Sequence, residues 1–295
     1  MKKFLTSVLA ALAITGAAFA QVPLQIQSVS VQKGIQVNGL KKIQISLKNE
    51  KLTIRENEDT EDKTLNIEVL SNYTASYPVL KNDGKTLKIE QKDNTNKLKD
   101  RVCELIICIP KDFKIQELKV TGGKGDIQVT NFKAHTIEIS SADGDVKISK
   151  IESSDFSSSV EKGSLTVRDV KVEKAAKINS SSGNITVSNL TAEEIVSESQ
   201  KGNLKFNDIN VKKVSINADK GTLDLNLDKL FEKDSAIRVS SGNAKVYLPS
   251  NATFWTSGSV DRGRFRSEFT QDSKGPLLSI KVGGGDIQLI KGSGL

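Results

Sequence analysis

The stretch from Gly125 to Leu248 repeats one short phrase, and Gly183-Asn184-Ile185-Thr186-Val187 is a clear copy of it: a glycine, a small polar residue and an apolar–polar–apolar triplet. The copies begin at Gly125, Gly144, Gly163, Gly183, Gly202, Gly221 and Gly242, so that successive glycines are 19, 19, 20, 19, 19 and 21 residues apart. A fixed period of about 20 residues is typical of stacked structural repeats.

Each repeat holds two short runs in which apolar and polar residues alternate, and this period of two predicts strands rather than helices. The second run follows later in the repeat, as in Ile137-Glu138-Ile139. Small or polar residues precede each glycine and suit a turn, for which glycine supplies the backbone freedom. We expect one apolar residue per repeat to fill the bend between the strands: Phe132, Ile151, Val170, Leu190 and Ile209.

Two short strands cannot bury their apolar side alone, whereas stacked repeats form a continuous core and pair their backbones with the repeats on either side. We therefore predict an all-β fold, a single-chain β-solenoid with about 19–21 residues per coil and about 4.8 Å between coils. The alternative is a β-sandwich, but the uniform spacing and the repeated turn chemistry favour the solenoid. The outward positions of the first strand would form a flat polar face: Gln128, Lys147, Thr166, Thr186, Lys205, Asp224 and Lys245.

The first 20 residues have the pattern of a secretory signal peptide. A positive start, Met1-Lys2-Lys3, precedes a short apolar run, and Ala18-Phe19-Ala20 forms a small-x-small cleavage site. The run is short and interrupted by polar residues, which disfavours a membrane anchor, and no later stretch is apolar enough to span a bilayer. We expect the chain from Gln21 onward to be exported to the periplasm, the cell surface or the medium.

The composition excludes several function classes. The 295 residues carry a formal charge of +7, which becomes +5 once Lys2 and Lys3 are removed, and a charged fraction of 27% is ordinary for a solvated surface. Aromatic residues make up only 5%, and the leader directs the chain out of the cytoplasm, so we expect no nucleic-acid partner. The sequence holds no nucleotide-binding loop, nucleophile motif or zinc spacing, and we expect no cofactor.

Four regions are expected along the chain: the signal peptide at 1–20, irregular N-terminal strands with long loops at 21–120, regular solenoid repeats at 121–250 and C-terminal coils at 251–295. In the second region a strand is expected at Val29-Ser30-Val31, a turn at Asn82-Asp83-Gly84 and a charged loop from Lys92 to Arg101. The last copy of the phrase, Gly285-Asp286-Ile287-Gln288-Leu289, is expected to close the solenoid. An uncapped end would expose a sheet edge through which two copies can associate.

Both cysteines lie in one strongly apolar run, from Val102 to Ile109. Cys103 and Cys108 are five residues apart, so they point to opposite faces of a strand, about 16 Å apart along it, which is too far for a disulfide. We expect two buried thiols; the alternative is that one of them pairs between molecules.

The residues that could support catalysis or metal binding are few. Asp126 and Asp145 hold the same place in successive repeats, about 5 Å apart when stacked, which is the separation of the carboxylates in retaining glycosidases. Both follow a glycine in a turn, where aspartate commonly accepts backbone hydrogen bonds. With Asp143 they could supply calcium ligands, but Gly122-Gly123-Lys124-Gly125-Asp126 brings aspartate one position too early for a calcium-binding nonapeptide. His135, the only histidine, has no partner at ligand spacing, and we expect neither a catalytic residue nor a metal site.

A basic stripe near the C-terminus is the one candidate binding site. Arg262, Arg264 and Arg266 alternate with Gly263, Phe265 and Ser267, so on a continuous strand the three arginines would share one face. Such a face could bind an anionic glycan or a lipid headgroup. The alternative is a solvated strand face whose charges form rim ion pairs.

Several phrases occur in a characteristic order. Leu105-Ile106-Ile107-Cys108-Ile109-Pro110 comes first and is followed by the copies of the repeat phrase that begin at Gly125. Val246-Tyr247-Leu248-Pro249 and the terminal copy from Gly285 to Leu289 come last. This arrangement resembles the putative adhesin family of bacterial β-strand-repeat proteins, which are domains of unknown function akin to the head GIN domain, over residues 30–290. The resemblance implies a right-handed β-solenoid of exported or envelope-associated proteins without established catalytic residues. This chain departs from the family in its long charged N-terminal loops.

These features together predict an exported, non-catalytic β-repeat protein of the bacterial cell envelope, with the role of a binding, adhesin-like or scaffold module. Its expected partners are an envelope glycan, a lipid headgroup, a protein or a second copy of the chain. The alternative is a carbohydrate-active β-helix enzyme whose acidic residues the sequence does not identify.

Overall fold

A computed structural model describes residues 33–57, 61–72, 77–91, 102–270 and 274–292. The predicted signal peptide, the expected strand at Val29-Ser30-Val31 and the charged loop from Lys92 to Arg101 lie outside these residues. The described residues form 21 strands and no helix, and therefore contain no helix that could cross a membrane.

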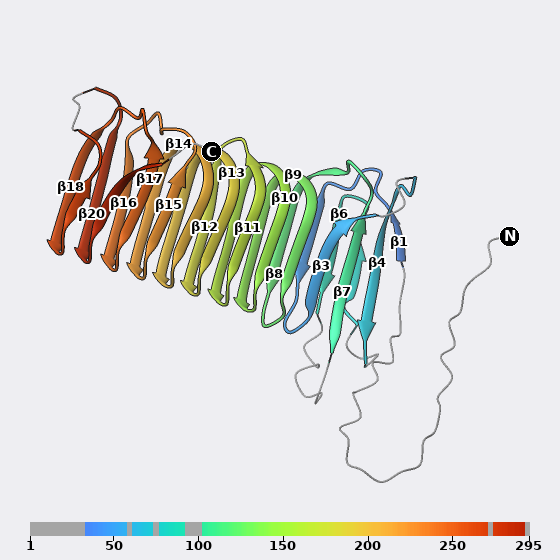
Figure 1. Cartoon of the computed structure of the whole chain (residues 1–295). Helices are drawn as coiled ribbons and strands as arrows, with labels where there is room; N and C mark the ends of the chain where they lie inside the picture. The colour runs from blue at the N-terminus through green and yellow to red at the C-terminus, as the bar shows by residue number, and fades with distance from the viewer. Residues whose placement is uncertain (1–32, 58–60, 73–76, 92–101, 271–273, 293–295) are drawn as a thin grey trace, which may run out of the picture.

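The strands stack into an elongated β-solenoid, which confirms the predicted fold over the β-sandwich (Figure 1). Neighbouring coils pair in parallel, one repeat apart. Val146, for example, lies beside Ile127 of the preceding coil and Leu165 of the following one. The period read from the sequence is therefore the length of one coil.

Each coil has two faces, with the strands that follow the repeat glycine on face 1 and those that precede it on face 2. Four strands bend through both faces: β9 (Ile127–Asp143), β10 (Val146–Lys162), β13 (Ile185–Lys201) and β14 (Leu204–Lys220). The other strands of face 1 are β1 (Lys33–Gln36), β3 (Lys51–Glu56), β4 (Thr64–Ser71), β7 (Cys103–Ile109), β11 (Leu165–Val172), β15 (Leu223–Leu227), β17 (Ala244–Pro249), β19 (Phe265–Ser267) and β21 (Ile287–Gly292). The other strands of face 2 are β2 (Lys42–Ser46), β5 (Val79–Asn82), β6 (Thr86–Glu90), β8 (Lys114–Gly122), β12 (Ala175–Ser182), β16 (Ser235–Ser241), β18 (Trp255–Arg262) and β20 (Leu277–Gly284).

Inward side chains of both faces form one continuous hydrophobic core. The five apolar residues predicted to fill the bend, from Phe132 to Ile209, are all buried. The predicted outward row, from Gln128 to Lys245, is exposed or half-exposed. Both predictions are confirmed, because side chains along a strand alternate between core and solvent.

The repeat glycines stack over one another at the corner between face 2 and face 1. A Cβ atom on Gly163 would lie 2.5 Å from the carbonyl oxygen of Gly144, and one on Gly144 would lie 2.6 Å from the carbonyl oxygen of Gly125. Gly163 also has a φ of +112°, which side chains disfavour. Backbone contact between successive coils thus requires glycine at this corner. Glycine therefore recurs once per coil, which produces the period seen in the sequence.

A second corner holds a left-handed residue in each of five successive coils, six positions after the repeat glycine. The φ values lie between 53° and 56° at Asn131, Lys150, Asp169, Asn189 and Asp208. Asparagine and aspartate tolerate this conformation better than other residues with a Cβ atom, because their side chains can hydrogen-bond locally. The turn places the next residue, the apolar bend residue, in the core.

The first complete coil of the chain is not its outermost coil. The coil of β2 and β3 lies between that of β6 and β7 and that of β8 and β9. Antiparallel strands then cover the end, with β4 on β7, β1 on β4 and β5 on β6. The predicted turn at Asn82-Asp83-Gly84 joins β5 to β6. These antiparallel strands protect the N-terminal edges of the parallel coils.

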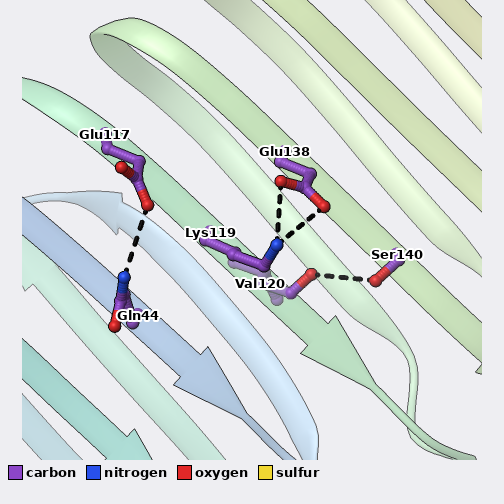
Figure 2. Close-up of polar contacts among 6 residues, drawn as sticks. All are labelled: Gln44, Glu117, Lys119, Val120, Glu138 and Ser140. Atoms are coloured by element: carbon purple, nitrogen blue, oxygen red, sulfur yellow. Dashed lines mark hydrogen bonds and ion pairs between the residues drawn. The ribbon is translucent and has the colours of Figure 1, made fainter.

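Side-chain contacts join the coil of β2 and β3 to its neighbour (Figure 2). Gln44 of β2 donates a hydrogen bond to Glu117 of β8 at 3.4 Å, and Lys42 pairs with the same carboxylate at 2.8 Å. Lys119 continues the row with an ion pair to Glu138 of β9 at 3.0 Å. The hydrogen bond from Lys42 lowers the pKa of Glu117, and partial burial opposes the shift.

The same reversal of order occurs at the C-terminal end. The coil of β20 and β21 lies between that of β16 and β17 and that of β18 and β19. The prediction that the copy from Gly285 to Leu289 closes the solenoid is therefore wrong. The inner position suits β20 because its Leu278 and Ile280 are buried in the core. At the equivalent positions β18 has Thr256 and Gly258, which would fill the core less well. We call β18 and β19 the outer coil.

The two cysteines point to opposite faces of β7 and do not form a disulfide with each other, as predicted. Cys103 lies in the core, whereas Cys108 is half-buried rather than buried. The difference arises because Cys108 faces outward between β3 and β4, which shield it only from the sides.

Candidate binding surface

The turn aspartates that could have served catalysis instead join neighbouring coils. The Oδ1 atom of Asp126 accepts the backbone N–H of Asp145 at 3.0 Å, and Oδ1 of Asp145 accepts that of Ser164 at 2.8 Å. The same contact recurs between Asn203 and Asn184 at 2.9 Å. A side-chain oxygen that receives a backbone N–H is the common use of aspartate and asparagine in turns, and this use explains the small polar residue of the repeat phrase.

The other residues considered for metal binding or catalysis do not converge. His135 and Asp143 are exposed and lie at opposite ends of the second half of β9. Within the described ranges, no group of three or more histidine, cysteine, aspartate or glutamate side chains is arranged to hold a metal ion.

A groove of about 460 Å³ runs across the second corner of the middle coils. Its charges alternate in sign along the stack: Lys133 lies 3.7 Å from Glu152 and 3.5 Å from Asp112. Asp169 accepts a hydrogen bond from Asn189 at 2.7 Å. These carboxylates already bind neighbouring side chains, and the groove is shallow and polar rather than an enclosed pocket of the kind that small ligands prefer.

The arginine stripe does not lie on one strand face, because the strand breaks at Gly263. Arg262 ends β18, Arg264 lies in the turn and Arg266 lies in β19, so the three side chains surround the corner of the outer coil. Arg264 pairs with Asp286 at 3.5 Å, and Asp286 also accepts the backbone N–H of Arg264 at 3.0 Å. The expectation of a shared strand face was wrong because Gly263 has a φ of +143° and forms a corner.

The outer coil is the most exposed part of the stack. Every residue from Asp261 to Glu268 is exposed. Among the described residues only three large hydrophobic side chains are exposed, and two of them lie here: Trp255 at 48% and Phe265 at 38%. Figure 1 shows β18 at the far end of the stack, beyond β20. Exposed aromatic and arginine side chains are the residue types that dominate binding surfaces.

Buried aromatic rings anchor the outer coil to the solenoid. Phe254, next to Trp255, lies edge to face with Phe231 at 6.1 Å and with Phe269 at 5.2 Å between ring centroids. Lys291 of β21 lies 5.6 Å above the ring of Phe269. These contacts hold both ends of the outer coil in place, so the backbone that carries its exposed side chains is packed against the solenoid.

A family model described as Toastrack DUF4097 matches residues 40–289, which is most of the chain. The chain belongs to the Toastrack DUF4097 family. The resemblance to the putative adhesin family of bacterial β-strand-repeat proteins, predicted from the ordered phrases, is thereby confirmed. No curated protein matches the chain.

Three solved structures are similar to this Toastrack chain. One is a putative adhesin from Parabacteroides distasonis, 14% identical over 89% of this chain and 98% of that one, with a TM-score of 0.46. The second is a putative adhesin from Bacteroides fragilis, 11% identical over 88% and 97%, with a TM-score of 0.40. The third is a putative lipid binding protein from Parabacteroides distasonis, 16% identical over 89% and 97%, with a TM-score of 0.39.

The alternation in the sequence singles out the three arginines but not the coil that presents them. Gly263-Arg264-Phe265-Arg266-Ser267 is itself a copy of the repeat phrase, with arginine in the small polar position. The structure confirms the equivalence, since Phe265 pairs with Ile287 and Ser267 with Leu289. Comparison with the other copies would have placed Gly263 at a corner.

Proposed function

We propose that this Toastrack chain is an exported, non-catalytic binding module of the bacterial cell envelope, adhesin-like in its role, that meets an anionic partner at the outer coil. The observation that carries the proposal is the pair of arginines, Arg262 and Arg266, on the coil that also exposes Trp255 and Phe265. In the described part of the chain neither guanidinium has a carboxylate within ion-pair distance, whereas Arg264 is paired with Asp286.

Guanidinium groups bind carboxylates and phosphates through two parallel hydrogen bonds, so closely spaced arginines favour a polyanionic partner. Three acidic side chains, Asp261, Glu268 and Asp286, lie near the corner, but none of them is within ion-pair distance of Arg262 or Arg266. Asp286 is taken up by Arg264, and Glu268 accepts the backbone N–H of Lys291 at 2.8 Å. Export is supported by the signal-peptide pattern of the first 20 residues.

Binding can be tested with isolated cell envelopes and with beads that carry polygalacturonate, an acidic polysaccharide, or dextran, a neutral one. The protein should bind the envelopes and the acidic beads and should pass the neutral ones. The variant Arg262→Gln/Arg264→Gln/Arg266→Gln should lose about tenfold or more in affinity, because charge-assisted hydrogen bonds contribute about 1.5–3 kcal/mol each.

A matched control removes three positive charges elsewhere on the stack, with Lys147→Gln/Lys162→Gln/Lys201→Gln. All three lysines are exposed. Equal loss in the two triple variants would mean that net charge alone drives binding and would refute a site at the outer coil. Protease digestion of intact cells tests the location: protection of the chain until the cells are lysed would contradict export.

A further inference from the structure

The two ends of the solenoid differ in how their sheet edges are covered. At the N-terminal end, β4 covers β7 on face 1 and β1 in turn pairs with β4, and β5 covers β6 on face 2. At the other end, β18 pairs with β20 and β19 with β21, and no described strand lies on their outer sides. The outer coil therefore presents unpaired backbone N–H and C=O groups along both faces, and such an edge is a template for another strand.

Side chains on this edge provide anchors for an added strand. The ring of Phe265 lies against Gly258 in β18, where an added Cβ atom would be 2.4 Å from the ring. Trp255 is exposed at the opposite end of β18. β18 has eight residues, about 26 Å at 3.3 Å per residue, so an added segment of about eight residues would span the distance from Trp255 to the arginine corner.

Charge determines which kind of strand fits. In a symmetric pairing of two copies through β19, Arg266 of one copy would face Arg266 of the other, and like charges directly opposite one another destabilise a sheet. An acidic strand would instead place its carboxylates beside Arg262 and Arg266, where opposite charges stabilise the pairing. Pairing of two copies through β19 is therefore disfavoured.

We propose that the open edge of the outer coil takes up an extended acidic polypeptide segment of about eight residues as an additional β-strand. The proposal rests on the proposed function and specifies its anionic partner. Main-chain hydrogen bonds to β18 hold the segment, its apolar residues pack on Phe265 and Trp255, and the carboxylates at its end reach the corner where Arg262 and Arg266 lie.

The only tryptophan of the chain, Trp255, reports directly on this edge. The probe is a synthetic eight-residue peptide of alternating glutamate and valine, added to the intact protein. Binding should shift the Trp255 emission to shorter wavelength and reduce its quenching by acrylamide, because the indole becomes shielded from water. A peptide of alternating lysine and valine, and a glutamate–valine peptide with alternate backbone nitrogens methylated, should cause no shift.

A charge-swapped variant makes the test independent of any loss of folding. Arg262→Glu/Arg266→Glu should weaken the glutamate–valine peptide by about tenfold or more per arginine and should create binding of the lysine–valine peptide. Equal binding of the methylated peptide would overturn strand addition, as would a variant that keeps its original preference.

Other outcomes separate this inference from the proposed function. If polygalacturonate shifts the Trp255 emission and no peptide does, the anion-binding function stands and the polypeptide partner is refuted. A shift that depends on protein concentration without any peptide would identify a second copy as the occupant and would also refute it. If neither polygalacturonate nor any peptide binds, both proposals fall.

Discussion

Replacing Gly163 by alanine tests whether backbone contact between coils sets the repeat. The new Cβ atom would lie 2.5 Å from the carbonyl oxygen of Gly144, whereas real Cβ atoms stay beyond 3.0 Å. The two coils must therefore separate by about 0.5 Å at this corner. Two hydrogen bonds between these coils flank the corner, from Gly144 to Lys162 at 3.1 Å and from Val146 to Ser164 at 2.9 Å, and the separation carries both to the limit of hydrogen bonding.

The expected loss of stability has two parts. Weakening the two backbone hydrogen bonds costs about 1–2 kcal/mol. The φ of +112° at Gly163 adds about 1–2 kcal/mol for a residue with a Cβ atom. The free energy of unfolding should therefore fall by roughly 2–4 kcal/mol in Gly163→Ala, which guanidinium unfolding followed by circular dichroism can measure.

Three other glycines separate the two parts. Gly283 has the same 2.5 Å approach, to the carbonyl oxygen of Ser240, without a positive φ. Gly84 has a φ of +85° with open space around it, and Gly284 has neither constraint. Alanine at Gly283 or Gly84 should thus cost about half as much as at Gly163, and alanine at Gly284 should be neutral or slightly stabilising. If Gly163→Ala is no more destabilising than Gly284→Ala, backbone contact between coils does not set the repeat.

Other substitutions test the second corner, the side-chain hydrogen bonds between turns of neighbouring coils, and the partly buried carboxylate of Asp228. Lys150→Asn should stabilise the chain by about 0.5–1 kcal/mol in the same unfolding assay, because asparagine suits its φ of 54°; an unchanged or lower stability would contradict this. Asn203→Ala should cost about 1 kcal/mol, since Oδ1 accepts the N–H and hydroxyl of Thr222 at 3.0 and 2.9 Å, and a neutral effect would argue against a stabilising role for these hydrogen bonds. Partial burial, and secondarily the charge of Asp208, raises the pKa of Asp228 above its ordinary 3.8. Its ionised form is therefore disfavoured in the fold, so the stability gained by Asp228→Asn should be absent below pH 3.8 and should appear as the pH rises through the raised pKa; a gain independent of pH would contradict this.

The sequence predicts the solenoid well because one physical contact recurs in every coil. The close approach of Gly144 to Gly125 excludes a side chain, and the turn residue after each glycine, such as Asp145, must accept or donate a backbone hydrogen bond. These two demands leave a glycine and a small polar residue at regular spacing. The bend residues follow the same logic, since each fills an equivalent place in the core.

The order of the coils at the two ends could not be predicted in the same way. Every coil carries the same alternation, so the pattern allows any coil to pair with any other, and the connections decide which ones meet. The arginine corner was misjudged for a related reason. Alternation of Arg262, Arg264 and Arg266 fits a strand equally well until Gly263 is aligned with Gly285, whose carbonyl oxygen lies under it at the glycine corner.

The reversal at the C-terminal end separates the residues that stabilise the stack from those of the proposed binding surface. The inner coil of β20 and β21 completes the core with Leu278, Ile280 and Val282, all buried. The outer coil then has little core left to fill, and inward positions such as Gly258 can be small or exposed. The outer coil contributes little to the core. Exposed tryptophan and arginine side chains on it therefore do not reduce the buried apolar area that stabilises the stack. This arrangement would explain why the most exposed coil of the solenoid is also the one with the residues best suited to a partner.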